Sequence, residues 1–135
     1  MLQLAELPDP RAAAGEVRVR LRWSGVNPSD VKSCAGLRSS AMPFPRVVPH
    51  SDGIGVIDAV GDGVSPTQIG QRVWLWNAAW GRAFGTAAEC ITLPERQAVA
   101  LPAAVSALLH CLQPGVFQAA SAHWPCFRAG SSAAS

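Results

Sequence analysis

The sequence contains no run of like charges, because its eleven basic and nine acidic residues are interspersed and leave a net charge of +2. This distribution excludes a nucleic-acid-binding arm and a polybasic membrane anchor, so a small molecule is the expected partner. No uncharged apolar run approaches the roughly 18 residues of a membrane-spanning helix, and no secretory signal pattern opens the chain. These absences predict a soluble cytoplasmic protein with no nucleic-acid or membrane partner.

Close pairs of cysteines are also missing. The four cysteines are far apart, with no Cys-x-x-Cys pair among them: Cys34, Cys90, Cys111 and Cys126. This spacing argues against a disulfide framework and a zinc knuckle, so reduced thiols are expected. His110 and His123 add possible ligands beside the last two cysteines, but their spacing matches no common zinc finger. We therefore expect no metal there.

Most patterns in the sequence predict short strands. Apolar residues alternate with three arginines in the clearest segment, with the period of a strand that has one buried and one exposed face: Val17, Val19, Leu21 and Trp23 against Arg18, Arg20 and Arg22. Solvation of these arginines is favoured over a phosphate-binding role. Residues 54–60, 73–76 and 86–93 predict further strands, and Gly61-Asp62-Gly63 a turn. The pattern predicts a mainly β, partly closed barrel.

A short helix is expected after the first strand. Ser29 or Asp30 can cap its start, and Gly36 can end it after Ala35. Three prolines between residues 43 and 49 then keep the chain extended, since proline lacks a backbone donor and disfavours a helical predecessor.

Three motifs follow one another at close spacing: Gly25-Val26-Asn27-Pro28-Ser29-Asp30, Val48-Pro49-His50-Ser51-Asp52-Gly53-Ile54-Gly55-Val56-Ile57 and Ile69-Gly70-Gln71-Arg72-Val73. Together they resemble the N-terminal GroES-like domain of the zinc-free quinone oxidoreductases, a branch of the medium-chain dehydrogenase/reductase superfamily. Agreement of several motifs in order is more specific than one short match. The resemblance implies a GroES-like barrel over residues 1–102, NADPH as cofactor, and hydride transfer to a planar carbonyl or quinone substrate.

In that family the cofactor is bound by a Rossmann domain, which we do not recognise after residue 102. An additional N-terminal strand of the family is also expected to be missing. Residues 103–135 form an atypical Ala/Ser-rich tail whose only charged residue is Arg128, and a shifted reading frame is our hypothesis for it. The chain alone is therefore expected to be inactive. The alternatives are an interaction module, self-associating through the uncovered domain surface, and a non-functional truncated product.

The resemblance also implies site residues. Zinc-dependent relatives have a cysteine in place of Asn27 and a Gly-His-Glu triplet in place of His50-Ser51-Asp52. Asparagine is a poor zinc ligand and the histidine is displaced by one position, so no catalytic zinc is expected. Asn27 is instead expected to donate to the acceptor's carbonyl oxygen. Lys32 is either a second donor or a solvated side chain, and Asp52 either orients groups in the cleft or caps a turn.

Two further patterns have simpler interpretations. Gly53 and Gly55 begin a Gly-x-Gly pattern that leads into a strand rather than a helix, so strand packing is favoured over pyrophosphate binding. Four aromatic side chains can wall a pocket for a planar ligand: Trp74, Trp76, Trp80 and Phe84. Because the first two share one face of a strand, packing is the favoured interpretation.

Overall fold

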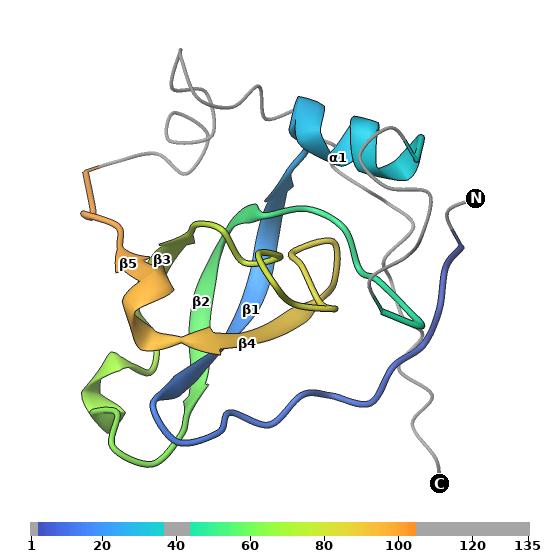
Figure 1. Cartoon of the computed structure of the whole chain (residues 1–135). Helices are drawn as coiled ribbons and strands as arrows, with labels where there is room; N and C mark the ends of the chain where they lie inside the picture. Colours follow the sequence, from blue (N-terminus) through green and yellow to red (C-terminus); the bar gives the residue numbers. More distant parts are fainter. Residues whose placement is uncertain (1–2, 37–43, 105–135) are drawn as a thin grey trace, which may run out of the picture.

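The computed structural model describes residues 3–36 and 44–104. Its five strands form one antiparallel sheet in the order β4-β1-β2-β3-β5 (Figure 1). The strands are β1 (Glu16–Gly25), β2 (Asp52–Val60), β3 (Arg72–Leu75), β4 (Cys90–Pro94) and β5 (Ala98–Ala100). The predicted mainly β architecture is confirmed. The expectations for Pro43, for a metal at residues 110–126 and for the tail beyond residue 104 lie outside the described residues.

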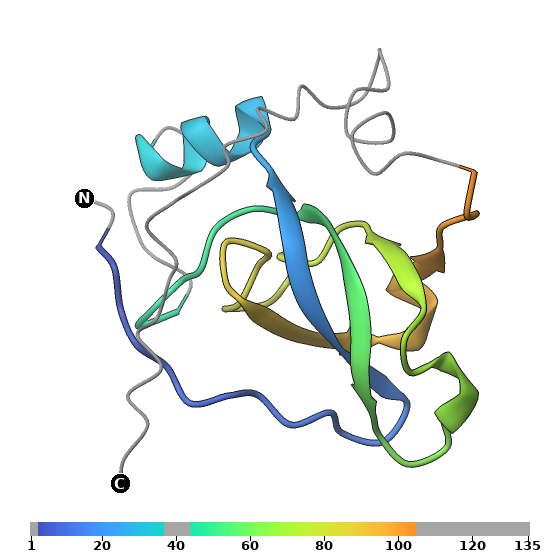
Figure 2. The same ribbon diagram turned by 180° about the vertical axis from the view of Figure 1, so that it is seen from behind.

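A single chain segment reaches both edges of the sheet. β4 pairs with β1 at one edge, and β5 pairs with β3 at the other, with only the 3-10 turn η2 (Glu95–Gln97) between them. The sheet must curl for such close neighbours in sequence to reach opposite edges. Figures 1 and 2 show the result, with β4 crossing the β1–β2 ribbon on one side. This curl produces the predicted partly closed barrel.

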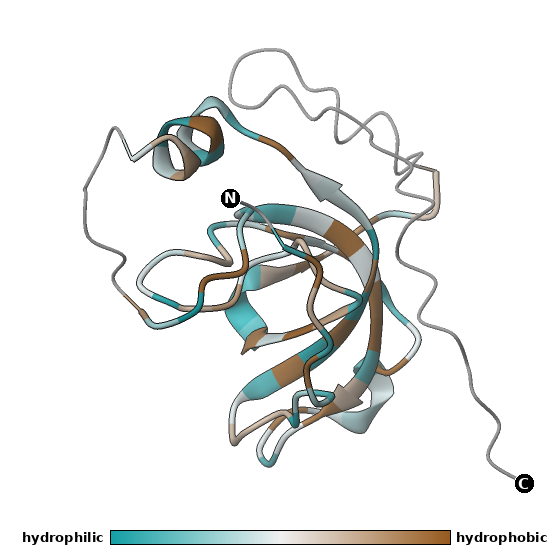
Figure 3. Cartoon of the chain, turned by 90° about the vertical axis from the view of Figure 1, so that its right-hand side faces the viewer, coloured by the Kyte–Doolittle hydropathy of each residue, from teal (hydrophilic) through white to brown (hydrophobic). Residues whose placement is uncertain are grey.

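The inner face of the curled sheet holds the hydrophobic core. Its centre is Val19, which pairs with Ile57 of β2 and Ile91 of β4. The cluster is completed by other buried aliphatic side chains: Val17, Val64, Val73, Leu75, Ala78 and Leu93. Each large aliphatic side chain buried in this way contributes about 1.5–3 kcal/mol. Along the strands, apolar and polar positions alternate (Figure 3), as expected for a sheet with one face on the core.

The first strand departs from the predicted alternation at Arg22. The register steps from the Leu21–Gly55 pair directly to the Trp23–Ile54 pair, so Arg22 is the extra residue of a β-bulge. One extra residue moves every following side chain to the other face of the sheet. Trp23 therefore lies on the outer face with Ile54, and the prediction that it shares the buried face of the β1 valines is wrong.

Helix α1 (Pro28–Cys34) begins two or three residues earlier than predicted. Its N-cap is Asn27 rather than Ser29 or Asp30. The Asp30 carboxylate accepts a hydrogen bond of 2.7 Å from the Asn27 backbone N–H, so Asp30 stabilises the helix start from the first turn. Gly36 has a φ of 72° and follows the helix, which agrees with its predicted role as the stop signal.

The strand predicted over residues 86–93 is shorter in the structure, where β4 begins at Cys90. Thr86 and Ala87 donate their backbone N–H groups to the carbonyls of His50 and Pro49, so this part of the chain pairs with a loop instead of the sheet. β5 was not predicted, because three residues are too few to show a period. A second 3-10 turn, η1 (Pro66–Gln68), connects β2 to β3.

Gly55 marks a close approach between β1 and β2. A Cβ atom here would lie 2.3 Å from the Arg20 carbonyl oxygen and 2.7 Å from Val19 Cγ1. We expect Gly55→Ala to lower the free energy of unfolding by about 3 kcal/mol, because a rigid neighbouring strand cannot move aside. Urea denaturation measures the change. Gly63→Ala is the control, since that position has open space but a φ of +84°, and about 1 kcal/mol should be lost. Equal losses would contradict a steric constraint at Gly55.

Candidate functional site

The structure brings Asn27 and Asp52 together where β1 ends and β2 begins. Asn27 Nδ2 donates a hydrogen bond of 2.7 Å to Asp52 Oδ2, and the residues are only 2% and 8% exposed. The sheet register explains the contact, because Gly25 at the end of β1 pairs with Asp52 at the start of β2. Two of the three predicted site residues therefore touch, although they are 25 positions apart in the sequence.

The third predicted site residue, Lys32, lies on the exposed surface of α1. No hydrogen bond or ion pair between described residues joins it to Asn27 or Asp52. Lys32 is therefore close to Asn27 in the sequence, but it makes no direct contact with the buried Asn27–Asp52 pair. Its role as a donor stays a prediction.

The Asn27 amide is only partly satisfied. One hydrogen of Nδ2 is taken by Asp52. The carbonyl oxygen Oδ1 is buried and has no hydrogen-bond partner among the described residues. A buried acceptor without a partner costs about 1–3 kcal/mol, so such an atom is uncommon in a domain selected for stability alone. The amide therefore has a buried acceptor to which no described residue donates a hydrogen bond.

Burial raises the pKa of the Asp52 carboxyl above the usual range of aspartate. Hydrogen bonds from the Asn27 side chain and from the Asn77 backbone N–H oppose this shift, and the nearby Asp30 carboxylate reinforces it. Desolvation is the largest of these effects, so the carboxyl retains a proton to higher pH than a solvated aspartate. The site thus combines a neutral amide with a carboxyl that is more easily protonated than most.

His50 extends the polar cluster through a chain of hydroxyl groups. Its Nδ1 lies 2.8 Å from Ser24 Oγ, which lies 2.9 Å from Thr86 Oγ1, and Thr86 donates to the Asp52 carbonyl at 2.7 Å. Because the Thr86 hydrogen is used there, Ser24 must donate to Thr86 and accept from His50. The proton of the neutral imidazole is thereby placed on Nδ1. Burial lowers the pKa of His50, outweighing the opposite effect of Asp30, and so favours the neutral ring.

Backbone strain is concentrated around the same carboxylate. Within the described ranges, the non-glycine residues with positive φ are His50 at 74° and Asn77 at 52°. The first lies two positions before Asp52, and the second donates its N–H to the Asp52 side chain. Left-handed conformations cost L-residues about 1–2 kcal/mol and cluster at functional sites. Zinc-dependent relatives have glycine in place of His50, as the first residue of their Gly-His-Glu triplet. Glycine adopts a positive φ without strain, so the conformation of His50 explains why glycine suits this position.

Sequence reasoning missed Ser24 and Thr86 as members of this cluster. It considered His50 only as a displaced zinc ligand on a strand, whereas the structure places it in the loop before β2. The three residues come from segments far apart in the chain, so no local pattern connects them. A serine at the end of an otherwise apolar and arginine-rich strand was the one available signal.

The remaining candidates are distributed as follows. Gly53 and Gly55 lie inside β2 with their Cβ positions blocked by β1, in agreement with the strand-packing interpretation. Trp76, Trp80 and Phe84 are 39%, 77% and 51% exposed, so they do not pack in the core of this domain.

Residues 3–36 and 44–104 contain no cluster of three His, Cys, Asp or Glu side chains placed to hold a metal. None of their helices is long and apolar enough to cross a membrane.

Comparison with known proteins identifies the family. Residues 13–103 match the alcohol dehydrogenase GroES-like domain, and the chain therefore belongs to this domain family of the medium-chain dehydrogenase/reductase superfamily. The human synaptic vesicle membrane protein VAT-1 homolog is 34% identical over 105 residues, which are 78% of this chain and 25% of that protein. This chain spans about a quarter of the length of the curated relatives it matches first.

Two solved structures share the fold. An alcohol dehydrogenase superfamily protein from Novosphingobium aromaticivorans superposes with a TM-score of 0.67 at 31% identity, over 76% of this chain and 31% of the other. A putative NADPH:quinone reductase from Bacillus thuringiensis gives 0.63 at 27% identity, over 73% and 28%. The GroES-like fold implied by the sequence motifs is thereby confirmed.

The raised pKa of Asp52 predicts a specific pH dependence of stability. A carboxyl that is harder to ionise in the folded state favours folding most below its unfolded pKa, and this advantage is lost as pH rises through the folded pKa. The unfolding free energy of the wild type relative to Asp52→Asn should therefore fall as the pH rises above about 4, the ordinary pKa of aspartate. Urea denaturation across this range measures it.

Asp62→Asn makes the same change at an exposed position and controls for the loss of one negative charge. A wild-type advantage over Asp52→Asn that grows with pH would show that Asp52 ionises more easily in the fold, against the effect of burial.

Proposed function

We propose that this domain binds and orients a planar carbonyl acceptor, such as a quinone or enone, for hydride transfer from NADPH. The observation that carries the proposal is the buried Asn27–Asp52 pair, in which the amide retains an unused N–H and an unpaired oxygen. The fold likeness to a putative NADPH:quinone reductase supports the choice of acceptor and cofactor. NADPH supplies the hydride in this proposal, and the described residues act on the acceptor alone.

Asn27 is the proposed direct contact to the acceptor. Its free N–H is suited to donate to the carbonyl oxygen, which becomes more negative as hydride arrives, so the bond strengthens toward the transition state. When the acceptor is a quinone, the hydride and a proton from solvent reduce it to a hydroquinone, whose hydroxyl group is suited to donate to Oδ1. One amide can therefore bind both the substrate and the product form of the same oxygen.

Asp52 is proposed as the positioning residue of this amide. By accepting from one N–H at 2.7 Å, it fixes which edge of Asn27 is presented to the acceptor. The Asn77 N–H holds the carboxyl in turn. Lys32 is proposed as an additional cationic donor, reaching the acceptor from the exposed surface of α1.

The donor set here does not fit a catalytic zinc ion. Zinc in such sites is bound by thiolate, imidazole or carboxylate groups, and Asn27 supplies an amide at the position where zinc-dependent relatives have cysteine. We therefore propose a zinc-free reaction. The described residues also contain no glycine-rich turn from a parallel strand into a helix, so we propose that residues 3–104 do not bind the pyrophosphate of the cofactor.

We further propose that residues 1–102 are one domain, that residues 103–135 are a separate tail, and that the protein is cytoplasmic.

A second candidate function is an interaction module. The exposure of Trp80 and Phe84, at 77% and 51%, supports it, because exposed aromatic residues often form contacts with other proteins. Light scattering coupled to gel filtration tests this candidate, and a strictly monomeric chain would argue against self-association.

Binding of a quinone by the purified chain tests the proposed function. Duroquinone is a suitable probe, because its fully substituted ring resists addition of the exposed Cys34 thiol. Asn27→Ser retains a good helix-capping residue but shortens the donor, and should weaken binding about 3- to 10-fold for one lost hydrogen bond. Two-dimensional amide NMR titrations measure the affinity and map the shifted residues.

Lys32→Gln separates the two interpretations of Lys32, since it should weaken binding only if the ammonium group contacts the acceptor. Undiminished binding by a folded Asn27→Ser variant, or shifts that avoid Asn27 and Asp52, would contradict the proposed role of the amide. In the same samples, NADPH absorbance should remain constant, because the proposal assigns no nucleotide site to the described residues.

A further inference from the structure

We propose that the candidate site binds the reduced, hydroxyl-bearing form of its acceptor more tightly than the oxidised form. This inference rests on the proposed function and adds the direction in which the site shifts the acceptor's redox equilibrium. The observation that carries it is Asn27 Oδ1, a buried oxygen to which no residue of the ranges 3–36 and 44–104 donates a hydrogen bond. Asn27 is only 2% exposed, so bulk water reaches this side chain poorly.

The polar groups around Asn27 are rich in hydrogen-bond acceptors. Asp52 Oδ2 accepts from Asn27 Nδ2 at 2.7 Å, and Asp30 Oδ2 accepts from the Asn27 backbone N–H at 2.7 Å. Two donors of Asn27 are therefore directed at carboxyl groups of the protein, whereas its side-chain oxygen is left over. An ionised carboxylate has about four lone-pair sites, so Asp52 keeps acceptor capacity beside Asn27. A ligand that brings a hydrogen-bond donor matches this surplus.

The two redox forms of a quinone differ in the property that Asn27 Oδ1 requires. A quinone oxygen can only accept hydrogen bonds, whereas a hydroquinone hydroxyl accepts and also donates. Addition of one hydride and one proton converts the first into the second, so the ring and its substituents stay the same. Because a buried acceptor without a partner is disfavoured, supplying its donor should strengthen binding about tenfold.

Tighter binding of the reduced form makes the bound acceptor easier to reduce. Thermodynamic linkage shifts the reduction equilibrium on the protein by the ratio of the two dissociation constants. For a two-electron couple, a tenfold ratio raises the reduction potential by about 30 mV. The same ratio predicts that the reduced acceptor displaces the oxidised one, so the site is subject to product inhibition.

Anaerobic titrations of the full chain with duroquinone and with durohydroquinone, followed by two-dimensional amide NMR, test this inference. The two compounds share the tetramethyl ring, so the contacts of the ring cancel in the comparison. We expect durohydroquinone to bind about tenfold more tightly and to shift the Asn27 side-chain amide resonances further. The dimethyl ether of durohydroquinone keeps the ring but has no donor, and should bind no more tightly than duroquinone.

Asn27→Ser should bring the ratio of the two dissociation constants close to one, because its shorter side chain withdraws the acceptor oxygen. General damage to the fold would weaken both ligands equally and leave the ratio unchanged, so the ratio reports on the oxygen itself. Gln71→Ser makes the same amide-to-hydroxyl exchange at an exposed position before β3 and should keep the wild-type ratio.

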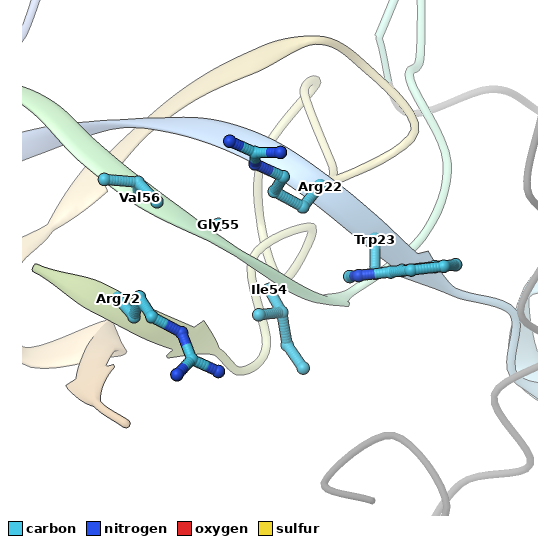
Figure 4. A pocket seen from close by; sticks show the side chains of 6 residues that line it. All are labelled: Arg22, Trp23, Ile54, Gly55, Val56 and Arg72. Atoms are coloured by element: carbon cyan, nitrogen blue, oxygen red, sulfur yellow. The ribbon is translucent and has the colours of Figure 1, made fainter. Parts of the chain in front are cut away.

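The outcomes separate this inference from the proposed function. Equal affinities of duroquinone and durohydroquinone at Asn27, or tight binding of the dimethyl ether there, would overturn the inference and leave the proposed function standing. An unchanged ratio in folded Asn27→Ser would do the same. Figure 4 shows a pocket on the outer face of the sheet, lined in part by Trp23, Ile54 and Val56. Shifts centred there, with none at Asn27 or Asp52, would contradict both.

Discussion

The pairing of β1 with β2 is the constraint on which the candidate site depends. These strands face each other from Val17–Val60 at one end to Gly25–Asp52 at the other. The last pair brings the carboxyl at the start of β2 to Asn27, just beyond β1. The bulge in the same ladder turns Trp23 outward, above Ile54. A shift of the register by one residue would separate the amide from the carboxyl and return the indole to the core. Gly55, whose Cβ would meet the β1 backbone, allows the two strands to come this close.

The buried amide–carboxyl pair shows how stability and a binding role oppose each other here. Removing Asp52 from water disfavours its ionised form, and two hydrogen bonds only partly offset that cost. Asn27 Oδ1 has no hydrogen-bond partner within residues 3–36 and 44–104, and His50 and Asn77 are held in left-handed conformations around the pair. The unpaired oxygen and the left-handed conformations each cost about 1–3 kcal/mol, and a purely structural domain would gain nothing from them. Burial of the apolar core around Val19, Ile57 and Ile91 stabilises the fold and offsets the cost of this site.

Local patterns in the sequence predicted most of the sheet, because alternation and β-branched runs are properties of neighbouring residues. They could not predict the bulge at Arg22, since Val17 to Trp23 alternates regularly and only pairing with β2 reveals the extra residue. The same limit applies to His50, Ser24 and Thr86, which meet only after folding. Asn27 and Asp52 were identified by resemblance to a family. Their contact, and the unpaired oxygen that it leaves, depend on the strand register and so needed the structure.

The charges around Asn27 determine which kind of ligand suits the candidate site. Asn27 is neutral and buried, and its amide can donate to a carbonyl or accept from a hydroxyl, whereas an anionic ligand would meet the Asp52 and Asp30 carboxylates nearby. The candidate site therefore favours a neutral acceptor over an anion, because burial leaves little water to screen a ligand's charge from these carboxylates.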